Sequence, residues 1–262
     1  MKLFGHTLSP NAMDFISHYE KSLDKQWRYE RLPYDHPSWG DLSQDEGFYI
    51  IGVKENMLGE AFEATFCHEF FHALQISRGF PTVAHNSEDD EDVKEYAQRL
   101  TFAIADLSAD DAVRKHGIDD AIVIKRRYKQ LKDLNRTNFA RCQTPLGKDL
   151  LAVDLITDLH SIEAGQKTLI MQNLKKNLPD VYEMYNAFQE KIEEFGYNTP
   201  QGCLKIYGTI INYVELWQHC HIAFRGKQIR SLQQFREALE NENKTEHQLE
   251  HYFASHNTID KP

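Results

Sequence analysis

The chain has 262 residues, 41% of them hydrophobic, and its 30 basic and 40 acidic residues give a formal net charge of −10 at pH 7. This composition excludes a wholly disordered chain, and the charge opposes binding to nucleic-acid phosphates or anionic lipid. No run of apolar residues is long enough to predict a membrane span. We therefore expect a globular protein with neither nucleic acid nor membrane as a partner.

The cysteines and the amino-terminal segment indicate the compartment. Four cysteines are scattered without a C-x-x-C pair, which is typical of reduced thiols rather than of a disulfide framework. The opening sequence, MKLFGHTLSPNAMDF, contains no apolar signal-peptide region. These two features favour a cytoplasmic protein.

The amino-terminal segment lacks a regular hydrophobic period, because Pro33, Pro37 and Gly40 interrupt an aromatic-rich stretch. We expect irregular structure throughout residues 1–45. The sequence GFYIIGV, residues 47–53, is the best candidate for a strand. The next segment, LGEAFEATFCHEFFHALQIS, is rich in alanine, glutamate and leucine and predicts a helix over 58–77 that ends at RGFP.

A predicted loop, PTVAHNSEDDED, follows and contains the acidic run 88–92. This run is either a cation-binding loop or a solvated helix start, and the helix start is favoured because carboxylates stabilise the positive end of a helix dipole. Beyond it we expect helices, interrupted at sequences such as QTPLG, NLPD and GYNTPQG. The expected helices span 92–116, 119–134, 147–175, 179–195, 203–224, 231–241 and 246–255.

These elements predict a mainly α (α+β) fold. The chain contains no internal repeat, no low-complexity segment and no long linker, so we expect a single domain over 1–262. Within it, 47–116 would form a core that carries the site, and 119–255 a helical carboxy-terminal subdomain. The basic run IKRRYKQLK, residues 124–132, is expected to be a solvated helix face.

The sequence HEFFH, residues 68–72, suggests a metal site. Residues at i and i+4 project from the same face of a helix, so both imidazoles of His68 and His72 can reach one ion at about 2.0–2.1 Å. Glu69 lies beside that ion, where it can act as a general base toward an activated water. The strand predicted just before the helix could be an edge strand that pairs with an extended peptide.

A catalytic zinc site needs a third protein ligand. The sequence ALQISRGFPTVAH after His72 offers no third histidine at the metzincin spacing, so a carboxylate is expected. Asp106 is favoured because it lies in an apolar helix turn, where an unpaired carboxylate is costly. Asp110, four residues later on the same face, could accept the free ring N–H of a ligand histidine. Glu91 and Glu95 stay as alternative ligands, although their segment is strongly charged.

The sequence HEFFH followed by DLSAD resembles the zincin metallopeptidases, in the gluzincin arrangement of His-Glu-x-x-His and a downstream acidic motif. It is also similar to ImmA/IrrE-type bacterial proteases. The resemblance covers roughly residues 47 to 115. This chain departs from both groups by an aspartate where glutamate is usual, so the two helices must approach more closely.

The resemblance implies a zincin-like helical core and one Zn²⁺ per chain, bound by His68, His72 and Asp106. It further implies that Glu69 is the general base and that Asp110 supports a ligand histidine. The expected activity is zinc-dependent hydrolysis of a peptide or protein substrate, a hydrolase of the protease class. Besides the substrate, a regulatory protein is a second candidate partner.

Two further histidines are candidates for stabilising the transition state. His160 and His219 each lie one helical turn from a glutamate, Glu163 and Glu215 respectively. The alternative for both is a satisfied polar group between packed helices. Tyrosines 207 and 213 are weaker candidates for the same role.

Two rival classes differ from the peptidase. A di-iron bundle also uses Glu-x-x-His, but it needs a second copy, and no histidine from His160 onward has a glutamate three residues before it. The other rival is a non-catalytic helical interaction domain, in which the motif is incidental or only binds metal. The metallopeptidase is the preferred hypothesis.

Overall fold

The structure is a computed structural model that describes residues 2–3, 5–57, 59–86, 88–132 and 144–242. Helices predominate over small sheets in these residues, which confirms the predicted mainly α (α+β) fold class. The predicted helix 246–255 lies outside the described residues. Among the helices that are described, none is long and apolar enough to cross a membrane.

The amino-terminal segment is regular, so the prediction of irregular structure there is wrong. The short strands β1 and β2 pair with each other, and α1 begins after Ser9, whose hydroxyl accepts a hydrogen bond from a backbone N–H of its first turn. Two longer strands, β3 and β4, follow. The elements are β1 (Lys2–Leu3), β2 (His6–Thr7), α1 (Pro10–Tyr19), β3 (Gln26–Leu32) and β4 (Gly40–Gln44).

The strand predicted at 47–53 forms as β5 (Phe48–Lys54) and lies in the middle of a three-stranded sheet. It pairs parallel to β3, with Gln26 opposite Phe48, and antiparallel to β4, with Gly40 opposite Val53. The expectation that this strand is an edge is therefore wrong. β5 is largely buried, whereas the flanking strands are largely exposed, and β4 is an edge strand of this sheet.

The two helices that carry the motifs form as predicted. α2 (Gly59–Ser77) matches the predicted helix 58–77, and α3 (Glu91–Lys115) matches 92–116. The acidic run 88–92 leads into α3 and supplies its first two residues, Glu91 and Asp92, as the helix-start interpretation predicts. Between the two helices, β6 (Thr82–His85) forms in the first part of the predicted loop.

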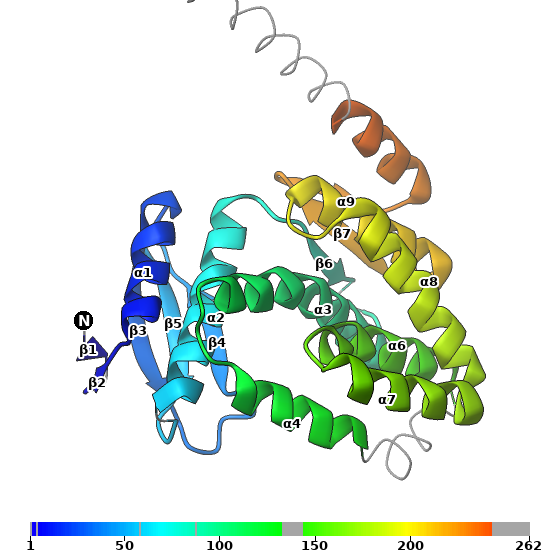
Figure 1. The fold of residues 1–262 in the computed structure, drawn as a ribbon. Coiled ribbons are helices and arrows are strands. Elements are labelled where there is room, and N and C mark those ends of the chain that lie inside the picture. The colour runs from blue at the N-terminus through cyan, green and yellow to red at the C-terminus, as the bar shows by residue number, and fades with distance from the viewer. Residues whose placement is uncertain (1, 4, 58, 87, 133–143, 243–262) are drawn as a thin grey trace, which may run out of the picture.

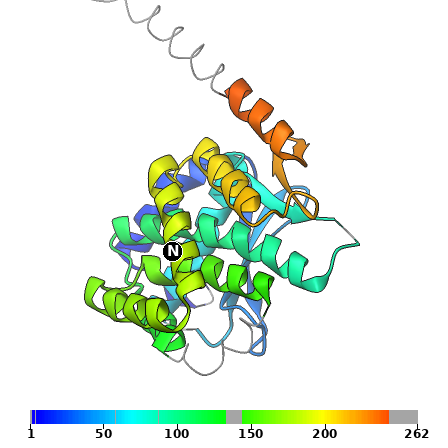
Figure 2. The same cartoon turned by 90° about the vertical axis from the view of Figure 1, so that its right-hand side faces the viewer.

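The carboxy-terminal half contains more breaks than predicted. The single helix expected over 147–175 is two helices, which meet at Ser161–Glu163, and the helix expected over 203–224 ends at Tyr213. Glu215 adopts a positive φ of 59°, and the chain then forms a β-hairpin that pairs with β6. The elements are α4 (Ala121–Lys132), α6 (Pro145–His160), α7 (Ala164–Asn177), α8 (Pro179–Phe195), α9 (Pro200–Tyr213), β7 (Cys220–Phe224), β8 (Lys227–Ile229) and a helix over 232–242, orange in Figure 2.

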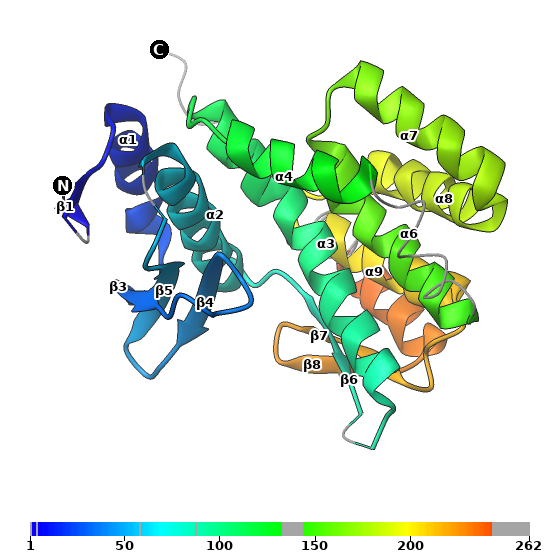
Figure 3. The same cartoon turned by 90° about the horizontal axis from the view of Figure 1, so that it is seen from below.

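Two hydrophobic clusters form the interior, and α3 belongs to both (Figures 1 and 3). Its first part, with Leu100 and Ile104, packs into the helical cluster of α6, α8 and α9. Its last part, with Ala109 and Val113, packs into the cluster of α1, β5 and α2. The turns of α3 that carry the two aspartates therefore lie where the clusters meet.

Candidate metal centre

α2 presents both histidines of the motif toward α3. Its opposite face is fixed by Phe66, Phe70 and Leu74, which are fully buried in the cluster with α1 and β5. Because helical residues four apart share a face, packing of this apolar stripe turns His68 and His72 together toward the neighbouring helix. Their rings lie 4.6 Å apart between centroids.

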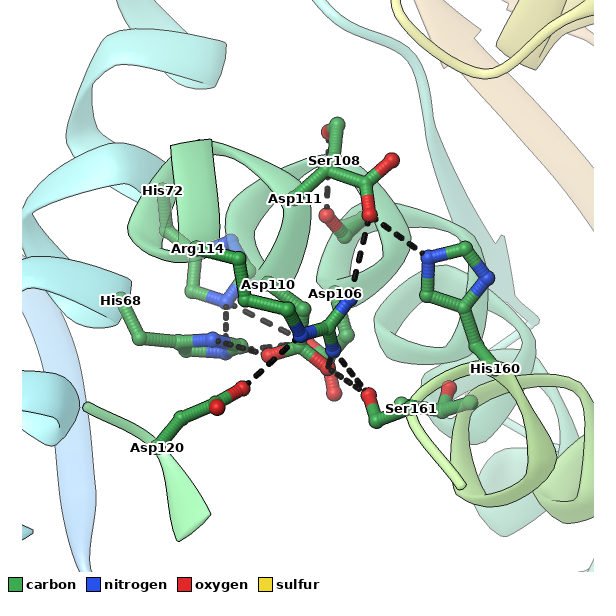
Figure 4. A network of polar contacts seen from close by, with 12 residues as sticks. His68, His72, Asp106, Ser108, Asp110, Asp111, Arg114, Asp120, His160 and Ser161 are labelled. Atoms are coloured by element: carbon green, nitrogen blue, oxygen red, sulfur yellow. Dashed lines mark hydrogen bonds and ion pairs between the residues drawn. The ribbon is translucent and has the colours of Figure 1, made fainter. Parts of the chain in front are cut away.

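Asp106 on α3 completes a triangle of three potential ligand atoms (Figure 4). The Nε2 atoms of His68 and His72 are 3.0 Å apart, and the Asp106 Oδ1 atom is 3.4 Å from the first and 3.3 Å from the second. Ligands at the usual zinc distances in a tetrahedral site are about 3.3–3.4 Å from one another. The triangle therefore fits one face of a zinc tetrahedron.

Asp110 fixes the orientation of the first histidine. Its Oδ1 atom lies 3.0 Å from His68 Nδ1, and because a carboxylate only accepts, this nitrogen carries the proton and leaves Nε2 free to ligate. The other carboxylate oxygen accepts a hydrogen bond from Arg127 on α4 and one from Ser161 at the end of α6. A largely buried network of hydrogen bonds thus connects the site to α4 and α6.

Gln75 has the same role for the second histidine. Its Oε1 atom lies 2.7 Å from His72 Nδ1, while its side-chain amide donates to the Ala105 carbonyl and to Ser108. Those two contacts fix which end of the amide is the oxygen, so Nε2 of His72 is also left free to ligate. Sequence reasoning missed Gln75, although its position three residues after His72 places it on the same helix face.

Arg127 was also missed, because it belongs to the basic run that was expected to be solvated. Its side chain is only 13% exposed and makes an ion pair with Asp110, whose side chain is 7% exposed. No local signal in the sequence distinguishes it from its neighbours. Its role depends on a partner on another helix.

The electrostatics of the cluster favour a cation. Burial alone would raise the pKa of Asp106, but hydrogen bonds with His68 and His72 hold this pKa well below its ordinary value. Burial likewise disfavours the charged form of His68, yet the two aspartates raise its pKa above the ordinary value. The two imidazoles and the carboxylate converge on one point, where either a proton or a metal ion can supply the balancing positive charge.

Glu69 lies beside the triangle and under the start of β4. Burial raises its pKa, and the charges of the two neighbouring histidines oppose this rise. A side-chain carbon added to Gly40 would be 2.6 Å from both Cγ and Oε1 of Glu69 and 2.7 Å from Cγ2 of Thr65. Glycine at position 40 therefore allows β4 to approach α2 this closely.

The site opens into a cleft of about 990 Å³. Residues 38–42 at the start of β4 line one wall, α2 and α3 form the floor, and α4 and α6 line the opposite wall. At one end, the cleft contains the exposed apolar side chains of Ile76 and Phe102. At the other end, the guanidinium of Arg126 stacks over the ring of Trp39, 4.3 Å from its centroid.

The structure does not bring the two other predicted histidines to the triangle. His160 binds the next aspartate along α3, with 2.8 Å between its Nε2 and Asp111 Oδ1, and lies apart from His68 and His72 (Figure 4). His219 forms an ion pair with Asp89 at 3.0 Å, near the start of α3. Among the described residues that line the cleft, neither histidine is present.

The alternative ligands lie elsewhere as well. Glu91 pairs with Lys94, and Glu95 pairs with Arg99. Of the weaker candidates, Tyr207 is buried and donates a hydrogen bond to a backbone carbonyl of α3, which is a structural role. Tyr213 is 53% exposed and lies beside Phe188. Glu163 and Glu215, the glutamates one helical turn from His160 and His219 in the sequence, do not line the cleft.

The described residues therefore contain one group that could hold a metal ion, formed by His68, His72 and Asp106. It combines two imidazole nitrogens with one carboxylate oxygen, and it leaves a side open to the cleft. Comparison with protein-family models, with curated proteins and with solved structures finds no match to this chain. The function must therefore be inferred from this site.

Proposed function

We propose that the protein is a zinc-dependent metallopeptidase that hydrolyses a peptide or protein substrate. The observation that carries the proposal is the triangle of His68 Nε2, His72 Nε2 and Asp106 Oδ1, with edges of 3.0, 3.4 and 3.3 Å. The site would hold one ion through these atoms. Two imidazoles and one carboxylate with an open fourth position are the ligand set of catalytic zinc.

The supporting contacts are those that a zinc site needs. Each ligand histidine donates its other ring N–H to a fixed acceptor, Asp110 for His68 and Gln75 for His72. Such contacts orient the rings and raise the basicity of the ligand nitrogens. Zinc bound there would supply Lewis acidity, which activates water and polarises a carbonyl group.

Glu69 would act as the general base. Its carboxylate adjoins the triangle, and burial raises its pKa toward the range in which a carboxylate accepts and returns protons efficiently. It would take a proton from the attacking water and deliver that proton to the leaving amine. The contact with Gly40 would keep the carboxylate in position through both steps.

The edge strand beside the site favours a peptide substrate. β4 pairs with β5 along one side and, as an edge strand, presents backbone groups that can pair with an extended chain. Its first residues line the same cleft as the triangle. A volume of about 990 Å³ is large enough for a few residues of an extended peptide.

The test is the substitution Glu69→Gln, with Glu60→Gln on the exposed first turn of the same helix as the matched control. Glutamine keeps the shape of Glu69 but cannot take the proton. We expect zinc-dependent cleavage of a peptide library to fall by at least about 100-fold in Glu69→Gln, with zinc retained, and to be unchanged in the control. Full activity in Glu69→Gln, or loss of zinc from it, would refute the assigned role.

A further inference from the structure

Asp158 on α6 lines the cleft from the wall opposite the start of β4. The residue is only partly exposed, and within the described part of the chain its carboxylate makes no hydrogen bond and no ion pair. The helix turn that carries it is tied to α3, because the buried hydroxyl of Thr157 donates to the Ala103 carbonyl. The carboxylate is therefore held against the cleft without a partner.

The charged groups around Asp158 are already paired with other residues. Arg127 is bound to Asp110, and Arg99 is bound to Glu95 and Asp154. The remaining neighbour, Asp106, belongs to the metal triangle and repels a second carboxylate. Burial raises the pKa of Asp158 to about 7, although Arg127 opposes the rise.

We propose that Asp158 selects substrates with a positively charged nitrogen, either a lysine or arginine side chain or a free amino terminus, near the scissile bond. The inference deepens the proposed peptidase function and rests on it. A partly buried carboxylate without an ion pair of its own is costly, and a cation that enters the cleft offsets this cost. A neutral or acidic group at the same place leaves the carboxylate unpaired or repelled, which is how a site rejects wrong substrates.

The experiment compares cleavage of peptides that differ in one charge. The first set of peptides carries a single lysine, placed at each position in turn. The second set carries Nε-acetyl-lysine at the same positions. Each peptide is prepared once with a free and once with an acetylated amino terminus. The variants are Asp158→Asn and, as the matched control, Asp149→Asn on the same helix. Asp149 also has a pKa raised by burial, to about 6, but does not line the cleft.

We expect kcat/KM of wild type to favour the lysine peptide by at least about tenfold at one position, mainly through a lower KM. The ratio should collapse toward one in Asp158→Asn and persist in Asp149→Asn. If only acetylation of the amino terminus lowers kcat/KM, the recognised nitrogen is the terminal amine. Zinc content and thermal stability are measured in parallel, and Asp158→Ser replaces Asp158→Asn if that variant does not fold.

Three results would overturn the inference. Cleavage by wild type without preference for either cationic nitrogen refutes the selectivity and leaves the peptidase function intact. A preference that is unchanged in Asp158→Asn or Asp158→Ser assigns the selectivity to other residues. Absence of zinc-dependent cleavage of every peptide refutes the proposed function, and the inference with it.

Discussion

Gly40→Ala tests whether the strand beside the site positions the general base. The added methyl carbon would lie 2.6 Å from Cγ and Oε1 of Glu69 and 2.7 Å from Cγ2 of Thr65. Ordinary carbon contacts are about 3.5–4.0 Å, so the neighbours must move by about 1 Å. Thr65 is β-branched and held within α2, whereas the Glu69 side chain can swing, so we expect the glutamate to be displaced.

A displacement of this size in a reacting group costs about 100-fold in rate. We therefore expect Gly40→Ala to lower kcat of peptide hydrolysis by about that factor. The free energy of unfolding should fall by about 1–3 kcal/mol, as in other over-packed sites. Zinc content should stay at the wild-type level, because the new carbon has its closest contacts with Glu69 and Thr65 rather than with the three ligands.

The assay combines steady-state hydrolysis, metal content and thermal unfolding. Gly47→Ala is the matched control, because a carbon added at Gly47 meets nothing within 4 Å. Wild-type kcat in a folded, zinc-loaded Gly40→Ala would refute the reasoning. Equal losses of kcat in both glycine variants would also refute it, since the effect would then not come from the contact with Glu69.

Two further predictions concern the aspartates. Asp110→Asn should lower zinc affinity by about 10–100-fold in a chelator competition, because His68 loses a charged acceptor. Asp111→Asn is the control, because Asp111 binds His160 and not His68, and this variant should bind zinc as wild type does. Asp158→Asn should become more stable than wild type as pH rises. The pKa of Asp158 is raised to about 7 in the folded protein, so above about pH 4 unfolding releases the proton of this carboxyl group. The free energy of unfolding of wild type therefore falls by up to about 2–4 kcal/mol between pH 4 and 7. A stability difference between Asp158→Asn and wild type that stays constant over this range in urea unfolding would contradict the second prediction.

The motif helix and its partner could be predicted from the sequence because their signals are local. The histidine spacing on α2 and the apolar turn around Asp106 on α3 each depend on residues within a few positions. The structure places His68, His72, Asp106 and Asp110 together, as the sequence predicted. The shorter aspartate is accommodated because α3 packs directly against α2.

The features that were missed depend on distant partners. β3 and β4 carry many charged and exposed residues, and they form strands because each pairs with the buried β5. β7 lies where a helix was predicted because it pairs with β6, which is far away in sequence. Arg127 is buried because Asp110 faces it from α3. Sequence patterns within one segment contain no record of these contacts.

Metal content is the most direct test of the account. Inductively coupled plasma mass spectrometry would compare wild type, His72→Ala and Asp106→Ala, all without a histidine tag, with His219→Ala as a control outside the cluster. We predict one zinc ion per chain in wild type and in the control, and loss of zinc in the other two variants. Wild type without zinc after reconstitution, or with zinc that survives both ligand substitutions, would contradict the account.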